Sequence, residues 1–202
     1  NKEEIDFIGG LAANNDVLAI STGLGNIYIL NYLTGKQIWK KNFLSQISAP
    51  PIIERDKIFV ITDDNQLLAI DVTSGVTLWN HSGNIETVSI LGGVSPAIDN
   101  GLVYVTYTSG EIFALNQNNG AIQWYENLGS EGLLSDGLIT DIQSPPVIYK
   151  DQLYVSSFSG KFVALESING ERLWELNLSI LNPITISGDY IYLIDTNNKL
   201  YC

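Results

Sequence analysis

The sequence has little of the chemistry that most catalytic and metal sites require. Its 202 residues include one cysteine and one histidine. The single cysteine, Cys202, excludes an internal disulfide. The single histidine, His81, excludes a multi-histidine metal site and leaves any catalytic triad dependent on one imidazole ring. No apolar run approaches the roughly 18 residues of a membrane-spanning helix.

Positive charge is also scarce. Lysine and arginine together number 10 against 22 acidic residues, which gives a net charge of -12. A polyanion such as nucleic acid would be repelled, so nucleic-acid binding is set aside. With 45% hydrophobic and 16% charged residues the chain is expected to fold. It begins with Asn1 and shows no signal-peptide pattern, so it is expected to be mature, trimmed or a fragment.

A repeated phrase contains every tryptophan of the chain. TGKQIW, SGVTLW, NGAIQW and NGERLW end at Trp39, Trp79, Trp124 and Trp174. The four copies align without a gap from Asp16, Asp56, Gly101 and Asp151, each 23 residues before its tryptophan. A fifth copy begins at Asp189, and the chain ends before its tryptophan. Internal repetition of this kind predicts a repeat architecture.

Each copy contains two short apolar runs and a glycine turn. The first runs (17–20, 58–61, 102–105, 153–155 and 190–194) and the second runs (27–30, 67–70, 112–115, 162–165 and 200–202) are rich in β-branched and aromatic residues, which favours strands. Because nearly every position is apolar, both faces of the sheet should be covered. The third position of the second run is mostly alanine. Cys202 occupies this position in the fifth copy and is expected to be buried.

The turns that follow close on Gly35, Gly75, Gly120 and Gly170, where hairpin geometry needs positive φ. A further strand is expected in the connectors, at SAPPII, VSPAI, SPPVI and NPITI. Their prolines indicate an edge strand. Successive tryptophans are 40, 45 and 50 residues apart, the range of a four-stranded propeller blade.

The sequence therefore predicts an all-β fold: a β-propeller segment of four-stranded antiparallel blades, four complete and a fifth partial, from a ring of eight. The expected blades span about 7–43, 48–82, 92–127, 143–178 and 181–202 in one domain. The four tryptophans and the four turn glycines are predicted to dock neighbouring blades, with the indole of one blade lying against the next.

The phrase Leu-Asp/Asn-x-x-x-Gly-x-x-x-Trp, preceded by Gly-x-Leu-x-Ala, resembles the PQQ-like repeat. The connectors IETVSILGGVSPAIDNG (85–101) and LITDIQSPPV (138–147), with YTSGEIFAL and DTNNKLYC, are similar to the B-subunit lipoprotein of the bacterial outer-membrane β-barrel assembly machinery in its alphaproteobacterial form. The resemblance covers essentially the whole chain. It implies a periplasmic, cofactor-free scaffold that is tethered to the inner leaflet of the outer membrane and binds the POTRA domains of the barrel subunit.

The same resemblance implies which residues meet that partner. They lie in two connectors, one carrying Val88, Ile90 and Leu91 and the other Asp141 and Gln143. Leu91 stands where the family has arginine and Gln143 where it has an acid, so the sequence departs from the family pattern at these two positions. These connectors are also the longest in the chain, as expected of binding loops. In the alternative, Val88 and Ile90 only staple their loop to the third blade.

The sequence also bears on other functions. A fragment of a quinoprotein dehydrogenase would need adjacent cysteines and a calcium site, which the sequence lacks, so no cofactor, metal or catalytic residue is expected. A generic adaptor or sensor propeller remains open. His81 is expected to face solvent in a turn, and Asp63 and Asp64 are expected to make local turn hydrogen bonds rather than bind calcium. An open arc of blades leaves apolar end faces, which predicts self-association of the chain as a homodimer.

Overall fold

The structure is a computed structural model that describes residues 8–84, 93–129, 142, 144–158, 160–180 and 182–202. These residues form four four-stranded sheets and one three-stranded sheet, in which every pairing between strands is antiparallel. Within the described residues, no helix is long and apolar enough to cross a membrane.

The sheets follow one another along the chain. The strands are, in order, β1 (Ile8–Ala13), β2 (Val17–Thr22), β3 (Asn26–Asn31), β4 (Gln37–Asn42); β5 (Ile52–Glu54), β6 (Lys57–Thr62), β7 (Gln66–Asp71), β8 (Thr77–Ser82); β9 (Ala97–Asp99), β10 (Leu102–Thr106), β11 (Glu111–Asn116), β12 (Ile122–Asn127); β13 (Val147–Tyr149), β14 (Gln152–Ser156), β15 (Lys161–Glu166), β16 (Arg172–Asn177); β17 (Thr185–Ser187), β18 (Tyr190–Ile194) and β19 (Leu200–Tyr201). We call these five sheets blades 1 to 5.

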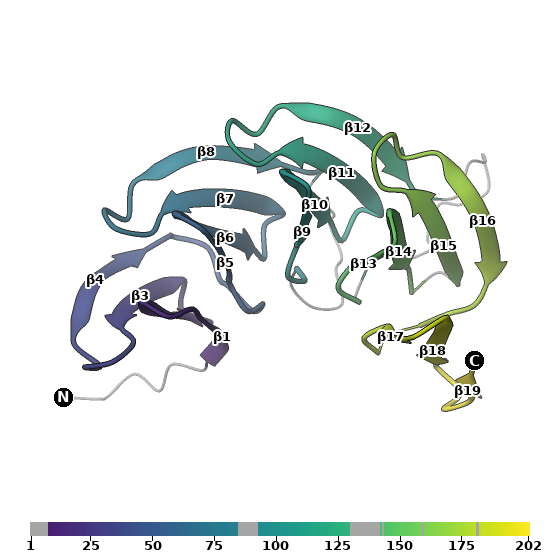
Figure 1. Cartoon of the computed structure of the whole chain (residues 1–202), viewed down its shortest axis with the longest axis horizontal. Helices are drawn as coiled ribbons and strands as arrows, with labels where there is room; N and C mark the ends of the chain where they lie inside the picture. Colours follow the sequence, from purple (N-terminus) through teal and green to yellow (C-terminus); the bar gives the residue numbers. More distant parts are fainter. Residues whose placement is uncertain (1–7, 85–92, 130–141, 143, 159, 181) are drawn as a thin grey trace.

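The blades stand side by side in an arc (Figure 1). The last strands β4, β8, β12 and β16 lie on its convex outer side, and the first strands lie on its inner side. This radial arrangement of antiparallel sheets is that of a β-propeller. The predicted fold class is confirmed.

The inner strands show why proline precedes them. β5, β9, β13 and β17 have three residues each and pair on one side only, with the second strand of their blade. Since proline has no N–H to donate, a short edge strand is where a preceding proline disturbs least. The edge strands predicted from the connectors are confirmed.

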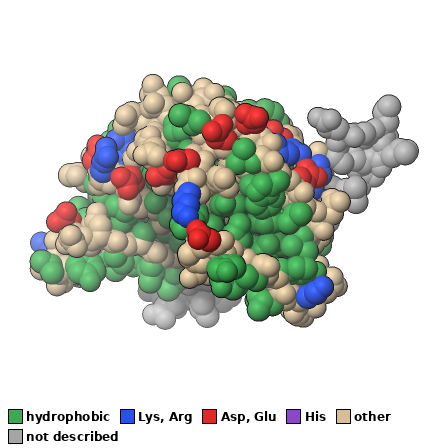
Figure 2. Space-filling view, turned by 45° about the vertical axis from the view of Figure 1, so that its right-hand side comes forward, with side chains coloured by type: hydrophobic (Ala, Val, Ile, Leu, Met, Phe, Trp, Pro, Cys, Tyr) green, Lys and Arg blue, Asp and Glu red, His purple; other side chains and the backbone are tan. Residues whose placement is uncertain are grey.

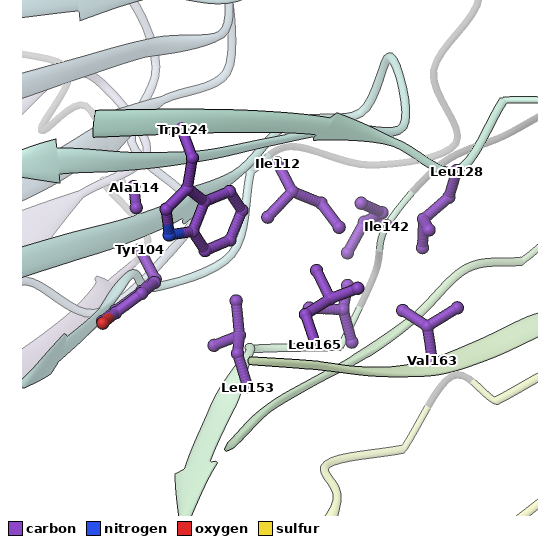
Figure 3. Close-up of a cluster of buried hydrophobic side chains, with 10 residues drawn as sticks. Tyr104, Ile112, Ala114, Trp124, Leu128, Ile142, Leu153, Val163 and Leu165 are labelled. Atoms are coloured by element: carbon purple, nitrogen blue, oxygen red, sulfur yellow. The ribbon is translucent and has the colours of Figure 1, made fainter. Parts of the chain in front are cut away.

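The middle strands are buried on both faces. β6, β7, β10, β11, β14 and β15 have buried side chains at nearly every position. There are four hydrophobic clusters, and each lies between two neighbouring blades. Figure 3 shows the cluster between blades 3 and 4, where Ile112 and Trp124 of one blade face Leu153 and Leu165 of the next. The core is thus divided among the blade junctions.

Each of the three junctions between blades 1 and 4 is closed by an indole ring lying on a glycine. A Cβ atom built on Gly75 would stand 3.1 Å from Trp39, one on Gly120 would stand 2.7 Å from Trp79, and one on Gly170 would stand 2.6 Å from Trp124. Those glycines have φ between +70° and +76°, so the same residue also makes the left-handed turn. Any side chain at these positions would push the indole away.

The indole nitrogen also binds the next blade. Nε1 of Trp39, Trp79 and Trp124 donates to the backbone oxygen of Val72 at 2.9 Å, of Gln117 at 3.2 Å and of Ser167 at 2.8 Å. The three acceptors occupy equivalent positions, one residue after the third strand of the blade. The ring is therefore oriented as well as buried.

The indole also explains the column of small residues. Ala69, Ala114 and Ala164 pair directly with the tryptophan of the neighbouring outer strand, and a bulge follows each pair. Cys202 is exposed, so the expectation that it is buried is wrong. The described residues include no outer strand beside β19 that would cover it.

The two ends of the arc lack half of this contact. A Cβ on Gly35 would meet nothing within 4 Å. Trp174 is 36% exposed, against 8% for Trp124, and the part of the chain that the structure describes holds no acceptor for its Nε1. Its ring lies against the rings of Phe162 and Tyr154, both of its own blade.

We predict that Gly170→Ala destabilises the protein more than Gly35→Ala. Both variants put alanine at a left-handed position, which costs about 1 kcal/mol. Only at Gly170 does the new methyl meet an indole, at 2.6 Å, and such overpacking costs roughly 1–3 kcal/mol more. Urea unfolding of both variants measures the difference. Equal losses of stability would show that the indole contact does not hold the blades together.

Candidate functional site

The blade connectivity places all long connectors on one face of the arc. In each blade the chain runs inward to outward, and it returns from the outer strand to the inner strand of the next blade. The connectors 43–51, 83–96, 128–146 and 178–184 therefore begin and end on the same face as the turn between the second and third strands. We call this the connector face. The tight turns that hold Gly35, Gly75, Gly120 and Gly170 lie on the opposite face.

The five residues predicted to bind a partner belong to the second and third connectors. Val88, Ile90, Leu91, Asp141 and Gln143 lie outside the described residues. The ends of both connectors are described, and they show how each is attached to the blades.

The second connector is packed tightly at both ends. A Cβ on Gly83 would stand 2.3 Å from the Tyr107 ring, and one on Gly93 would stand 2.4 Å from Ile61. Ser95 Oγ then donates to the backbone oxygen of Pro50 at 2.8 Å, which ties the returning chain to the end of the first connector, just before blade 2. Both described ends of the second connector are thus held at the blade 2–blade 3 junction.

A polar cluster surrounds the start of this connector. Glu111 is 5% exposed, and its carboxylate accepts hydrogen bonds from Asn84 N at 2.7 Å, Asn84 Nδ2 at 2.8 Å and Ser109 Oγ at 2.6 Å. Asn84 is the last described residue before the predicted contact positions. A buried carboxylate is stable only when its oxygens are satisfied, and these three donors satisfy them.

Asn65 joins the cluster from the turn of blade 2. Its backbone has φ of 59°, a left-handed conformation that asparagine tolerates. Its Nδ2 donates to Asn84 O at 2.6 Å, and its Oδ1 accepts from Thr108 N at 3.3 Å and Thr108 Oγ1 at 3.1 Å. One side chain that is 2% exposed therefore links blade 2, the connector and blade 3.

His81 lies beside this cluster, and the expectation that it faces solvent in a turn is wrong. It belongs to β8, two residues after Trp79 and on the same face of the strand. Its ring is half-buried, 4.4 Å from the Phe113 ring centre, and its Nδ1 is 2.8 Å from Tyr107 Oη. The strand continues past Trp79 to Ser82, so His81 adds a second contact between blade 2 and blade 3 beside that of the tryptophan.

The third connector is anchored by apolar side chains. Leu128 at its start is 0% exposed and Ile142 near its end is 1% exposed, and both belong to the cluster between blades 3 and 4. Ile142 stands between the two predicted contact positions, Asp141 and Gln143. Ser144 Oγ donates to the backbone oxygen of Asn182 at 3.1 Å, which ties this end to the fourth connector just before blade 5.

The acids Asp63 and Asp64 lie in the turn between β6 and β7, as the sequence predicts. Asp64 accepts from Thr62 Oγ1 at 2.5 Å, which is the expected local bond, whereas Asp63 accepts from Ser48 Oγ of the first connector at 2.7 Å, which is not local. The described residues contain no group of three or more His, Cys, Asp or Glu side chains that could hold a metal ion.

Reasoning from the sequence missed Asn65, Asn84, Tyr107 and Glu111. The signal was in the repeat: Asn65 stands where the three other complete copies have Gly25, Gly110 and Gly160. Gly83 stands where they have Phe43, Leu128 and Leu178. A departure from the repeat at two neighbouring places marks a junction that is built differently.

Comparison with known proteins gives consistent matches. The family model described as "Outer membrane protein assembly factor BamB" matches residues 2–202. An uncharacterized protein of Rickettsia prowazekii is 28% identical over 196 residues, which are 95% of this chain and 47% of that protein. The outer membrane protein assembly factor BamB of Shewanella oneidensis is 25% identical over 193 residues, covering 95% of this chain and 49% of that protein.

Among solved structures, BamB from Moraxella catarrhalis superimposes with a TM-score of 0.84 at 27% identity, covering 95% of this chain and 58% of that chain. The chain thus spans about half the length of the curated relatives it matches.

We predict that stability falls as the pH drops through 6.5 and that His81→Phe weakens this dependence. Partial burial lowers the pKa of His81 below 6.5, and the charge of Glu111 opposes the shift only in part. The unfolded chain therefore binds the proton first, so stability is full above pH 6.5 and declines below it. Phenylalanine keeps the ring contact with Phe113 and does not titrate. Urea unfolding between about pH 7.5 and pH 5.5, above most carboxylate titrations, measures it. Identical pH slopes in the two proteins would contradict this assignment.

Proposed function

This chain belongs to the family described as outer membrane protein assembly factor BamB, and we propose that it is a non-catalytic, protein-binding propeller segment of the machinery that assembles β-barrel proteins in the outer membrane. Its partner would be the POTRA domains of the barrel subunit. Its place would be the periplasm, at the inner leaflet of the outer membrane, held there by a lipid anchor on the whole protein.

The observation that carries this proposal is the position of the two longest connectors. Both leave the connector face from neighbouring junctions, blade 2–blade 3 and blade 3–blade 4, and both are anchored at their two ends. Loops held in this way on a rigid scaffold are where repeat proteins carry binding residues.

The binding would depend on a few apolar anchors with polar residues around them. Val88, Ile90 and Leu91 would supply the anchors from the second connector, and Asp141 and Gln143 would supply polar contacts from the third. Anchors of this kind carry most of the energy of an interface, because they are fully desolvated on binding.

A catalytic role is less well supported. The only histidine, His81, is engaged with Tyr107 and Phe113 at a blade junction, so it is not available as a general base in a cleft. The relatives named above as BamB carry the name of an assembly factor. We therefore assign no reaction to the chain.

We predict that Ile90→Asp weakens binding to the purified POTRA domains of the barrel subunit by about tenfold or more, as expected for the loss of a buried apolar anchor. Leu44→Asp is the matched control. Leu44 is fully exposed in the first connector of the same face, so the same charge there should leave the affinity unchanged. Isothermal titration calorimetry measures both. An unchanged affinity for Ile90→Asp, or an equal loss for both variants, would refute the assignment of the second connector.

We also propose that copies of this chain associate through the end faces of the arc. Blade 1 exposes Ile8 and Leu11, and blade 5 exposes Tyr190, Ile194 and Leu200. Figure 2 shows hydrophobic side chains gathered over the side of the molecule that its view brings forward, the side of blades 4 and 5. Faces that are sandwiched between blades elsewhere in the arc expose apolar surface here, and such patches drive association.

We predict a sedimentation coefficient that rises with protein concentration, and a loss of this rise in Leu200→Asp. Leu200 is 64% exposed on blade 5, so the new carboxylate would be desolvated only on association. Leu44→Asp should behave as the parent does. A parent chain that sediments as a monomer at its highest soluble concentration would rule out this association.

A further inference from the structure

The junction between blades 2 and 3 is built differently from its neighbours on the connector face. At the junctions of blades 1 and 2 and of blades 3 and 4, a large apolar residue at the start of the connector, Phe43 or Leu128, corresponds to a small residue of the next blade, Thr62 or Ser157. Between blades 2 and 3 the sizes are exchanged: the connector begins with Gly83, and the Tyr107 ring fills the space. This exchange keeps the junction packed while it removes the connector's own apolar anchor.

Hydrogen bonds replace that anchor. The backbone bond is the same at all three junctions: Phe43 N, Gly83 N and Leu128 N donate to the oxygens of Gly25, Asn65 and Gly110. Only Asn65 has a side chain at that position, and it holds Asn84 O at 2.6 Å. The next residue of the connector is thus bound on its backbone oxygen by Asn65 and on its backbone N–H by Glu111.

The carboxylate of Glu111 makes this arrangement costly. It is 5% exposed, and no described lysine or arginine forms an ion pair with it. Burying a carboxylate without a cation is unfavourable. A junction whose connector begins with a large apolar residue, as at Leu128, avoids this cost. The carboxylate fixes the orientation of Asn84, because its two oxygens accept from the backbone N–H and from the side-chain amide of that residue.

We propose that Asn65, Asn84 and Glu111 are positioning residues that set the direction in which the second connector leaves blade 2, so that Val88, Ile90 and Leu91 are presented to the POTRA partner with little loss of conformational entropy on binding. This inference rests on the proposed function. A connector that is oriented before binding costs less to order in the complex, which raises affinity without any new contact.

The exchange of the amide and the carboxylate tests this proposal. Asn84→Asp places two carboxylates in contact in a buried cluster, and Glu111→Gln replaces the acceptor by an amide. The double variant Asn84→Asp/Glu111→Gln restores a donor–acceptor pair and the net charge of the parent. Glu126→Gln is the matched control, because it makes the same charge change at an outer-rim ion pair with Arg172.

Two measurements are made on the full chain: amide hydrogen exchange of residues 83–93 without partner, and affinity for the purified POTRA domains. We expect Asn84→Asp to speed exchange in 83–93 by about tenfold or more and to weaken binding, as for a buried group left unsatisfied. The double variant should recover most of both losses, and Glu126→Gln should change neither. Asn65→Gly, which restores the glycine of the other complete copies, should speed exchange in 83–93 alone. This variant provides the test if Asn84→Asp does not fold.

The outcomes separate the two proposals. If exchange rises throughout the chain, or if the double variant recovers nothing, the cluster only supports the fold and the positioning role is refuted. If exchange in 83–93 responds as expected and the parent binds the POTRA domains, but affinity is the same in all variants, the link from orientation to binding is refuted. If exchange responds and the parent itself does not bind, the proposed function fails while the orienting role of the cluster stands.

Discussion

Contact between an indole ring and a glycine of the next blade is the interaction on which the rest of this structure depends. A sheet that is apolar on both faces cannot stand alone in water, so each blade requires a neighbour at a defined distance and angle. The indole sets the distance by lying on a residue without a side chain, and its N–H sets the angle by reaching one carbonyl. The glycine must also adopt positive φ. One residue type thus meets a steric and a conformational requirement at once, which explains why Trp and Gly occur at fixed places in the phrase.

The fold could be predicted because this requirement recurs. Every blade needs the same contact, so the sequence repeats Trp and Gly at constant spacing and the pattern is visible without an alignment. The position two residues later in the outer strand is different. Lys41 donates to Gly75 O at 3.0 Å, His81 meets Tyr107, and Glu126 pairs with Arg172. All three contact the next blade, but each by another chemistry. The repeat therefore has no common residue at this position, and the sequence alone led to the prediction that His81 lies in a turn.

The candidate site was predictable only in part, for a related reason. The length of two connectors pointed to the connector face, and the resemblance to a known family supplied the predicted contact positions. The cluster of Asn65, Asn84 and Glu111 has no motif of its own, since its members come from two blades and a connector. It can be found only as a departure from the repeat, in the glycine column at Asn65 and in the large apolar column at Gly83. These two departures can be interpreted only once the structure shows that Asn65 and Gly83 lie at the same junction.

A repeat architecture allows a departure of this kind at limited cost. Each blade contacts only its neighbours, so the free energy lost by burying Glu111 is confined to one junction. The junctions on either side keep a large apolar residue at the start of the connector, Phe43 or Leu128, and the Trp79 indole still closes the altered junction on Gly120. The indole contact on the outer part of the blades therefore leaves the connector face free to vary. A propeller of this design can bind the first residues of one connector by different contacts without changing the arrangement that holds its blades together.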